Sequence, residues 1–180
     1  MPTEIASWSA RAVPTSTDVW RRTVVLVAIG GVALALGLLI YLGDRQASHA
    51  LLIPTLPALA GSQLFGVLGQ WLPSFVHTFA FSLFTAAALA PGSTPRYGAC
   101  VAWCAVNIAF ELGQHPRISA RLAEALHGSF GDAPAARALA RYFVRGTFDV
   151  GDIAAAIVGA LAAAALMRLI QAHPERHHAH

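Results

Sequence analysis

The chain has 180 residues, of which 56% are hydrophobic and only 12% are charged. Soluble domains carry about 25% charged residues, so this composition, with a mean hydropathy of +0.57, argues against an ordinary soluble domain and predicts a membrane protein. The formal net charge is +3, but the arginines that carry the positive charge are scattered, which argues against nucleic-acid binding. A chain of this length is expected to form one compact unit, an all-α helical bundle.

The first predicted element is a transmembrane helix over residues 23–42, which follows an N-terminal tail of residues 1–22. It contains no charged side chain, and about 20 helical residues are needed to cross a bilayer core of about 30 Å. Arg21 and Arg22 stand directly before it. A cleaved signal peptide has a shorter apolar stretch of about 7–15 residues. We therefore interpret this segment as a retained signal anchor.

The next apolar stretch, residues 51–72, is interrupted by Pro54, Pro57 and several glycines. Gln63 and Gln70 would also need hydrogen-bond partners inside a lipid bilayer. We expect this stretch to be interfacial or re-entrant and to lie over the bundle.

Two further spans are predicted over residues 75–90 and 97–112. Only the turn-rich sequence PGSTPRYG joins them, so they should form an antiparallel hairpin. Polar side chains recur on the second of these spans at a spacing that keeps them on one face of a helix. They are Cys100, Cys104, Asn107, Glu111 and Gln114.

The two cysteines in this stripe have two interpretations of equal weight, a functional one and a role as small residues in a helix–helix seam. Cys100 and Cys104 are four residues apart on one helix, which is a poor arrangement for a disulfide. They are also a weak metal signal, because no second pair of ligands lies nearby in the sequence.

Residues 116–146 form a polar, amphipathic segment with helical periodicity. We expect two short helices on the membrane surface, the second over about residues 133–144. The row Arg137, Arg141 and Arg145 is expected to contact lipid phosphates nonspecifically, and a dedicated phosphate subsite is the alternative.

The last predicted span covers residues 150–170 and precedes a C-terminal tail of residues 171–180. Its N-terminal end carries Asp149 and Asp152. The residues that follow them on the same helix face are small, which allows close helix contact. Asp149 suits a helix cap as well as a functional site, and both interpretations stay open. Asp152 lies further inside the helix and favours a site.

These spans bring polar residues together. His77 opens one span, Glu111 and Gln114 close the next, and Asp149 and Asp152 open the last, so all should reach the same membrane face. Ionisable groups are costly in a membrane and mark functional positions. We therefore predict that His77, Glu111 and Asp152 lie within one cluster.

The sequences PSFVHTFAFSLF, AFELGQ and RGTFDVGDIAAAIVGA resemble the VanZ-like family of small bacterial membrane proteins, whose name comes from teicoplanin resistance. The resemblance covers about residues 72–165. Ser74 and Phe75 stand where family members carry an acid and a lysine, and Ala156 stands in an asparagine position. The resemblance implies a set of site residues, namely His77, Glu111, Gln114, Arg145, Asp149, Asp152 and Gly159.

Three classes of function follow. The leading one is a bacterial cell-envelope factor whose polar pocket binds a lipid head group, a lipid-linked precursor or a lipophilic glycopeptide. Its binding residues would be His77, Asn107, Glu111, Gln114, Arg145, Asp149 and Asp152. The second is an intramembrane enzyme acting on a lipid phosphate or polyprenyl carrier. The third is a purely structural or partner-binding role, with the acids in a hydrogen-bonded knot.

For the enzyme, Glu111 or His77 would be the general base and Arg145 would face phosphate. Asp149 and Asp152, with Glu111, would hold a divalent cation.

Sidedness is expected from the residues beside the first span. Four spans divide the arginines equally between the two sides, so their number alone does not orient the chain. Arg21 and Arg22, together with the family's association with antibiotics that act on the envelope, favour a multi-pass protein of the cytoplasmic membrane with an extracytoplasmic site.

Overall fold

The computed structural model describes residues 15–44, 66–89 and 93–172. These residues form six α-helices and no β-strand, which confirms the all-α prediction. The helices are α1 (Ser16–Asp44), α2 (Gly66–Ala88), α3 (Ser93–Gly113), α4 (Pro116–Phe130), α5 (Pro134–Arg145) and α6 (Val150–Ala172).

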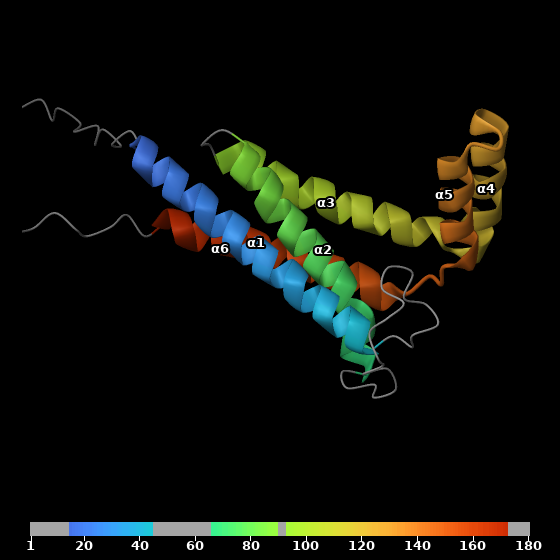
Figure 1. Ribbon diagram of the computed structural model, residues 1–180, viewed down its shortest axis with the longest axis horizontal. Helices are drawn as coiled ribbons and strands as arrows, with labels where there is room; N and C mark the ends of the chain where they lie inside the picture. The colour runs from blue at the N-terminus through green and yellow to red at the C-terminus, as the bar shows by residue number, and fades with distance from the viewer. Residues whose placement is uncertain (1–14, 45–65, 90–92, 173–180) are drawn as a thin grey trace, which may run out of the picture.

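Four long helices, α1, α2, α3 and α6, lie side by side and form the bundle (Figure 1). Helix α2 is central and contacts α1, α3 and α6. Helices α2 and α3 are antiparallel, as the short connection between them predicted. The shorter helices α4 and α5 pack against each other beyond the C-terminal end of α3 (Figure 1).

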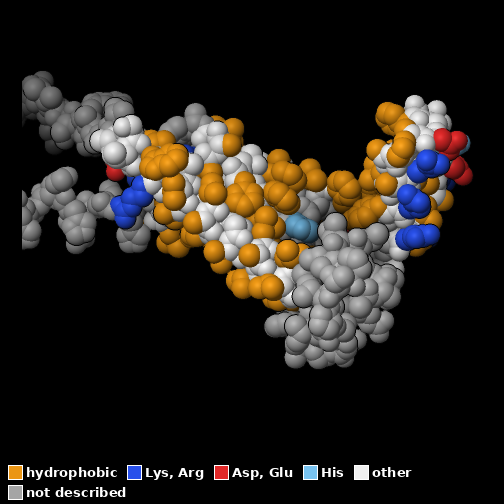
Figure 2. Space-filling model, viewed as in Figure 1, with side chains coloured by type: hydrophobic (Ala, Val, Ile, Leu, Met, Phe, Trp, Pro, Cys, Tyr) orange, Lys and Arg blue, Asp and Glu red, His pale blue; other side chains and the backbone are white. Residues whose placement is uncertain are grey.

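The bundle core is built largely from small and aliphatic side chains. Its buried residues are Leu26, Leu83, Ala86, Cys100, Ala160, Ala163 and Met167. Outside the core, large apolar side chains are exposed on α1 and α6, such as Leu39 and Leu161, each 65% exposed. Figure 2 shows hydrophobic side chains over much of the visible surface of the bundle. An apolar exterior of this kind suits a lipid environment.

Two of the described helices are both long and apolar enough to cross a membrane, fewer than the four expected. They are α1 over Ser16–Ile40 and α6 over Val150–Ala172. Helices α2 and α3 have 23 and 21 residues, similar to the 23 of α6, but polar residues interrupt them. Pro73 and His77 lie within α2, and Arg96, Asn107 and Glu111 lie within α3.

Helix α1 begins before the expected span because a capping box starts it. The Thr15 side-chain oxygen accepts a hydrogen bond from the Asp18 backbone N–H at 3.3 Å, and Asp18 accepts one from the Thr15 N–H at 3.1 Å. This reciprocal pair satisfies two donors at the helix start.

Helix α2 also begins earlier than predicted, at Gly66, and continues through Pro73. Residues 66–72 of the expected re-entrant stretch are therefore its first turns, while residues 51–65 lie outside the described residues. Because of this earlier start, His77 lies well inside the helix and does not open it.

Helices α4 and α5 confirm the two short helices predicted between residues 116 and 146. Pro116 and Pro134 each occupy the first turn, where a missing N–H is tolerated. Gly131 ends α4 with φ of 58°, a conformation that favours glycine. Phe143 on α5 is buried and stacks on Phe110 of α3, with ring centroids 5.6 Å apart.

Candidate functional site

Glu111 joins the end of α3 to the start of α6. It is only 9% exposed, and its Oε1 accepts a hydrogen bond from the backbone N–H of Asp149 at 2.6 Å. The N–H groups at a helix start have no partner within the helix, so a carboxylate from another helix stabilises them. This contact confirms the prediction that Glu111 lies beside the N-terminal end of the last span.

Asp149 is both a helix cap and part of the tertiary cluster. Its Oδ1 accepts a hydrogen bond from the Gly151 N–H at 2.7 Å, which is the N-cap interaction, and its Oδ2 accepts one from Trp71 Nε1 at 3.0 Å. Gly151 is required here, because a Cβ at this position would overlap the Trp71 indole. The two interpretations that the sequence left open are therefore compatible.

Asp152 lies one turn further into α6 and contacts α2. Its Oδ1 accepts a hydrogen bond from Ser74 Oγ at 2.6 Å. The charges of Asp149 and Asp152 both act on Glu111. We call these three residues, with their donors Trp71 and Ser74, the acidic cluster; it draws side chains from α2, α3 and α6.

Gln114 and Tyr142 extend the cluster towards α5. A Cβ on Gly146 would overlap the Gln114 side chain, so Gln114 packs directly against that glycine. Partial burial raises the pKa of the Tyr142 phenol, the charge of Glu111 raises it further, and a hydrogen bond with Gln114 opposes the rise. Tyr142 therefore lies close enough to the cluster, on its α4–α5 side, for the charge of Glu111 to act on it.

Three predicted site residues lie apart from the cluster. His77 is exposed and stacks on Phe81, with ring centroids 5.9 Å apart, and within the described chain no hydrogen bond or ion pair joins it to Glu111. Asn107 donates a hydrogen bond from Nδ2 to the Trp103 carbonyl of its own helix at 2.9 Å. Arg145, in the last turn of α5, is exposed.

Cys100 and Cys104 are both free thiols, as their spacing predicted. Cys100 belongs to the buried core, which supports the seam interpretation for this residue.

Trp71 and Ser74 were missed as site residues by sequence reasoning. A tryptophan near a helix end is typical of the membrane–water interface, so Trp71 carried a usable signal. Ser74 was noted only as a departure from the family pattern, and nothing in its surroundings distinguishes it from other serines.

The candidate cation ligands Glu111, Asp149 and Asp152 all accept hydrogen bonds from the protein. Among the described residues, no group of three or more His, Cys, Asp or Glu side chains is arranged to hold a metal ion. Both carboxylate oxygens of Asp149 already accept hydrogen bonds from Trp71 and Gly151. The divalent cation that the enzyme alternative requires is therefore not supported by the geometry.

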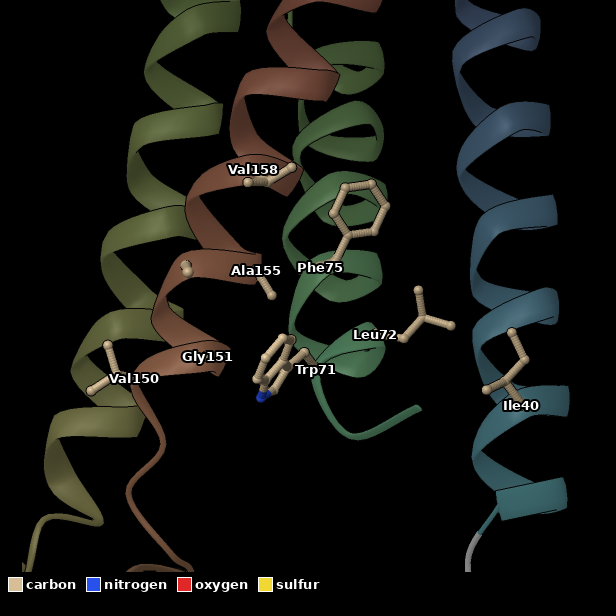
Figure 3. Close-up of a pocket in the computed structure, with 9 residues that line it drawn as sticks. Ile40, Trp71, Leu72, Phe75, Val150, Gly151, Ala155 and Val158 are labelled. Atoms are coloured by element: carbon tan, nitrogen blue, oxygen red, sulfur yellow. The ribbon is translucent and has the colours of Figure 1, made fainter. Parts of the chain in front are cut away.

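An apolar groove of about 820 Å³ lies beside the cluster, between α1, α2 and α6 (Figure 3). Ile40, Leu72, Phe75, Ala155 and Val158 are among its lining residues. Trp71 belongs to both features: its ring lines the groove, and its N–H binds Asp149. The apolar groove thus adjoins a set of hydrogen-bonded carboxylates.

No family model, no curated protein and no solved structure matches this chain.

Proposed function

We propose that this chain is a VanZ-like, multi-pass protein of the bacterial cytoplasmic membrane that binds an amphipathic lipid at the acidic cluster. In this proposal α1, α2, α3 and α6 all cross the bilayer. Support comes from their arrangement, because α2 packs along both candidate membrane spans, α1 and α6, and α3 packs along α2 and α6. A helix packed along two membrane-crossing neighbours tolerates polar residues that face the bundle.

The observation that carries the proposal is the shared position of Trp71. An apolar chain in the groove would reach the Trp71 ring, and a head group beyond it would meet Asp149 and Asp152. The groove volume of about 820 Å³ falls within the range of about 300–1,000 Å³ found for ligand pockets. Carboxylates accept hydrogen bonds, so the head group should carry hydroxyl, amide or ammonium donors.

Membrane lipids, lipid-linked envelope precursors and lipophilic glycopeptides share this combination of an apolar chain and a donor-rich head. Sidedness in the proposal rests on Arg21 and Arg22, which stand directly before the apolar part of α1, at the end of the bundle opposite the acidic cluster. Arg21, Arg22, Arg96 and Arg168 belong to the end where α1 and α3 begin and α6 finishes. Basic residues beside membrane helices favour the cytoplasm, which would place the acidic cluster at the extracytoplasmic face.

A groove-filling variant tests the proposal. Ala155→Phe places a large ring in the groove, whereas the matched control Ala102→Phe adds the same ring to an exposed face of α3. Native mass spectrometry after mild detergent extraction should show lipid retained by the wild type and by Ala102→Phe. Ala155→Phe should lose most of that lipid while keeping its helical content.

A structural role is the second candidate, because donors on the protein already occupy oxygens of Glu111, Asp149 and Asp152. It predicts that Ala155→Phe and the control retain the same lipids as the wild type. The cluster would then be a hydrogen-bonded knot that fixes α6 against α2 and α3.

A further inference from the structure

Arg96 is a buried arginine at the end of the bundle opposite the acidic cluster. It lies in the first turn of α3 and is 6% exposed, and its Nε has no hydrogen-bond partner. A buried N–H of an arginine is rarely left without a partner, because the lost hydration is compensated only by hydrogen bonds or an opposite charge. This feature belongs to neither the acidic cluster nor the groove beside it.

Helical periodicity places a second arginine over the same end of the core. Arg96 lies four residues before Cys100 on α3, and Arg22 lies four residues before Leu26 on α1. Residues four apart share a helix face. Since Cys100 and Leu26 both belong to the buried core, both arginines lie beyond that core at one end of the bundle. The positive charge of Arg22 acts on Arg96.

The surroundings of this pair favour an anion. The start of α3 presents the positive end of the helix dipole. Asp18, four residues before Arg22 on α1, is exposed; its Oδ2 accepts hydrogen bonds from Thr15 at 2.7 and 3.1 Å, and its charge also interacts with those of Arg22 and Arg21. The positive charges of Arg22 and Arg96 therefore act on each other near a helix start, and an oxyanion would stabilise both guanidinium groups and that helix start.

We propose that Arg96 and Arg22, at the N-terminal end of α3, bind a phosphate group. The depth of the site suits a lipid phosphate. Trp20, adjacent to Arg21 and Arg22, is 71% exposed, and exposed tryptophans next to a membrane helix occupy the head-group region. Free inorganic phosphate offers the same chemistry to the two guanidinium groups. The site does not depend on lipid binding at the acidic cluster.

The test compares two arginines at the same end of the bundle. Arg96→Gln removes the buried guanidinium, whereas the matched control Arg168→Gln removes an exposed one that lies over the Tyr97 ring at 5.4 Å. Protein is extracted in micelles that contain phosphatidylglycerol and phosphatidylcholine, and bound lipid is measured by native mass spectrometry. In parallel, thermal unfolding in uncharged detergent is followed with sodium phosphate and with sodium chloride at equal ionic strength.

We expect Arg96→Gln to retain about tenfold less phosphatidylglycerol than the wild type, the effect of losing a charged hydrogen bond to the phosphate. Arg168→Gln should stay within about twofold of the wild type, because an exposed charge is screened by solvent. If the ligand is free phosphate, lipid retention stays unchanged and phosphate raises the melting temperature of the wild type but not of Arg96→Gln.

If Arg96→Gln and Arg168→Gln lost phosphatidylglycerol equally, the proposed site would be overturned, because the loss would reflect a general effect of charge. It is also overturned if Arg96→Gln changes neither lipid retention nor the response to phosphate. Should Arg96→Gln fail to fold, Arg22→Gln is compared with Arg168→Gln in the same assays under the same expectations.

Discussion

Glu111 accepts a hydrogen bond from the backbone N–H of Asp149 across a separation of 38 residues, at a distance of 2.6 Å. The contact closes the segment that contains α4 and α5, so these helices leave the bundle and return to it at nearly the same point. The start of α6 is thereby held against the end of α3. This relationship places the acidic cluster at one end of the bundle, beside the groove.

Glu111→Gln tests whether the charge of this residue has a function. The glutamine Oε1 can still accept the hydrogen bond from Asp149, so the melting temperature in detergent should change little. If the carboxylate charge attracts a donor-rich head group, lipid retention and any envelope phenotype, such as drug susceptibility, should be lost. A stable variant with full lipid retention would remove Glu111 from the proposed site.

Glu111→Ala supplies the comparison for stability. It removes the acceptor and leaves the Asp149 N–H without its partner, which should lower the free energy of unfolding by about 1–3 kcal/mol. If Glu111→Gln and Glu111→Ala both lost the envelope phenotype in proportion to their loss of folded protein, the cluster would have a structural role.

Trp71→Phe separates the polar and apolar roles of the indole. The variant keeps a ring in the groove but loses the donor to Asp149, and a bond to a carboxylate contributes about 1.5–3 kcal/mol. Trp103→Phe is the matched control, because its Nε1 donates to Thr85 Oγ1 at 2.8 Å, away from the groove. Both variants should have lower melting temperatures than the wild type, but only Trp71→Phe should reduce lipid retention in native mass spectrometry. Equal retention in the two would contradict a ligand role for Trp71.

Gly159→Ala tests the close contact between α2 and α6. An added Cβ would lie 2.5 Å from the Phe75 carbonyl oxygen, and backbone in a packed helix cannot move aside easily. We expect a loss of about 1–3 kcal/mol in the free energy of unfolding.

Gly31→Ala in α1 is the control for this helix contact, because no heavy atom lies within 4 Å of the added Cβ. Alanine is favoured over glycine in helices by about 1 kcal/mol, so this variant should melt at or above the wild-type temperature. If Gly159→Ala and Gly31→Ala had the same melting temperature, the close contact between α2 and α6 would be contradicted.

The exposed arginines of α5 lead to a prediction about the membrane surface. Arg137 and Arg141 are exposed on α5 (the basic side chains of the α4–α5 pair are visible in Figure 2). In nanodiscs with anionic lipid, amide hydrogen exchange in α5 should be slower than in neutral nanodiscs, and added salt should remove the difference. Replacing both arginines by glutamate should remove it too. An unchanged difference in that variant would exclude lipid contact through this row.

Several features could be predicted from local periodicity and from the alternation of helix directions. The amphipathic periodicity of residues 116–146 predicted two short helices, and the prolines at their starts and Gly131 between them set the boundaries. The stripe of small residues on α6 predicted close packing, which Gly159 realises against α2. The alternation of helix directions also predicted that Glu111 and Asp149 meet.

The composition of the acidic cluster was decided by tertiary structure. Trp71 and Ser74 reach α6 across 78 residues of sequence, whereas His77 on the same helix is exposed. Periodicity shows which residues share a face of one helix, but the rotation and offset of that helix depend on how side chains from distant segments pack. The identity of the acids could therefore be predicted from sequence, and the partners that hold them could not.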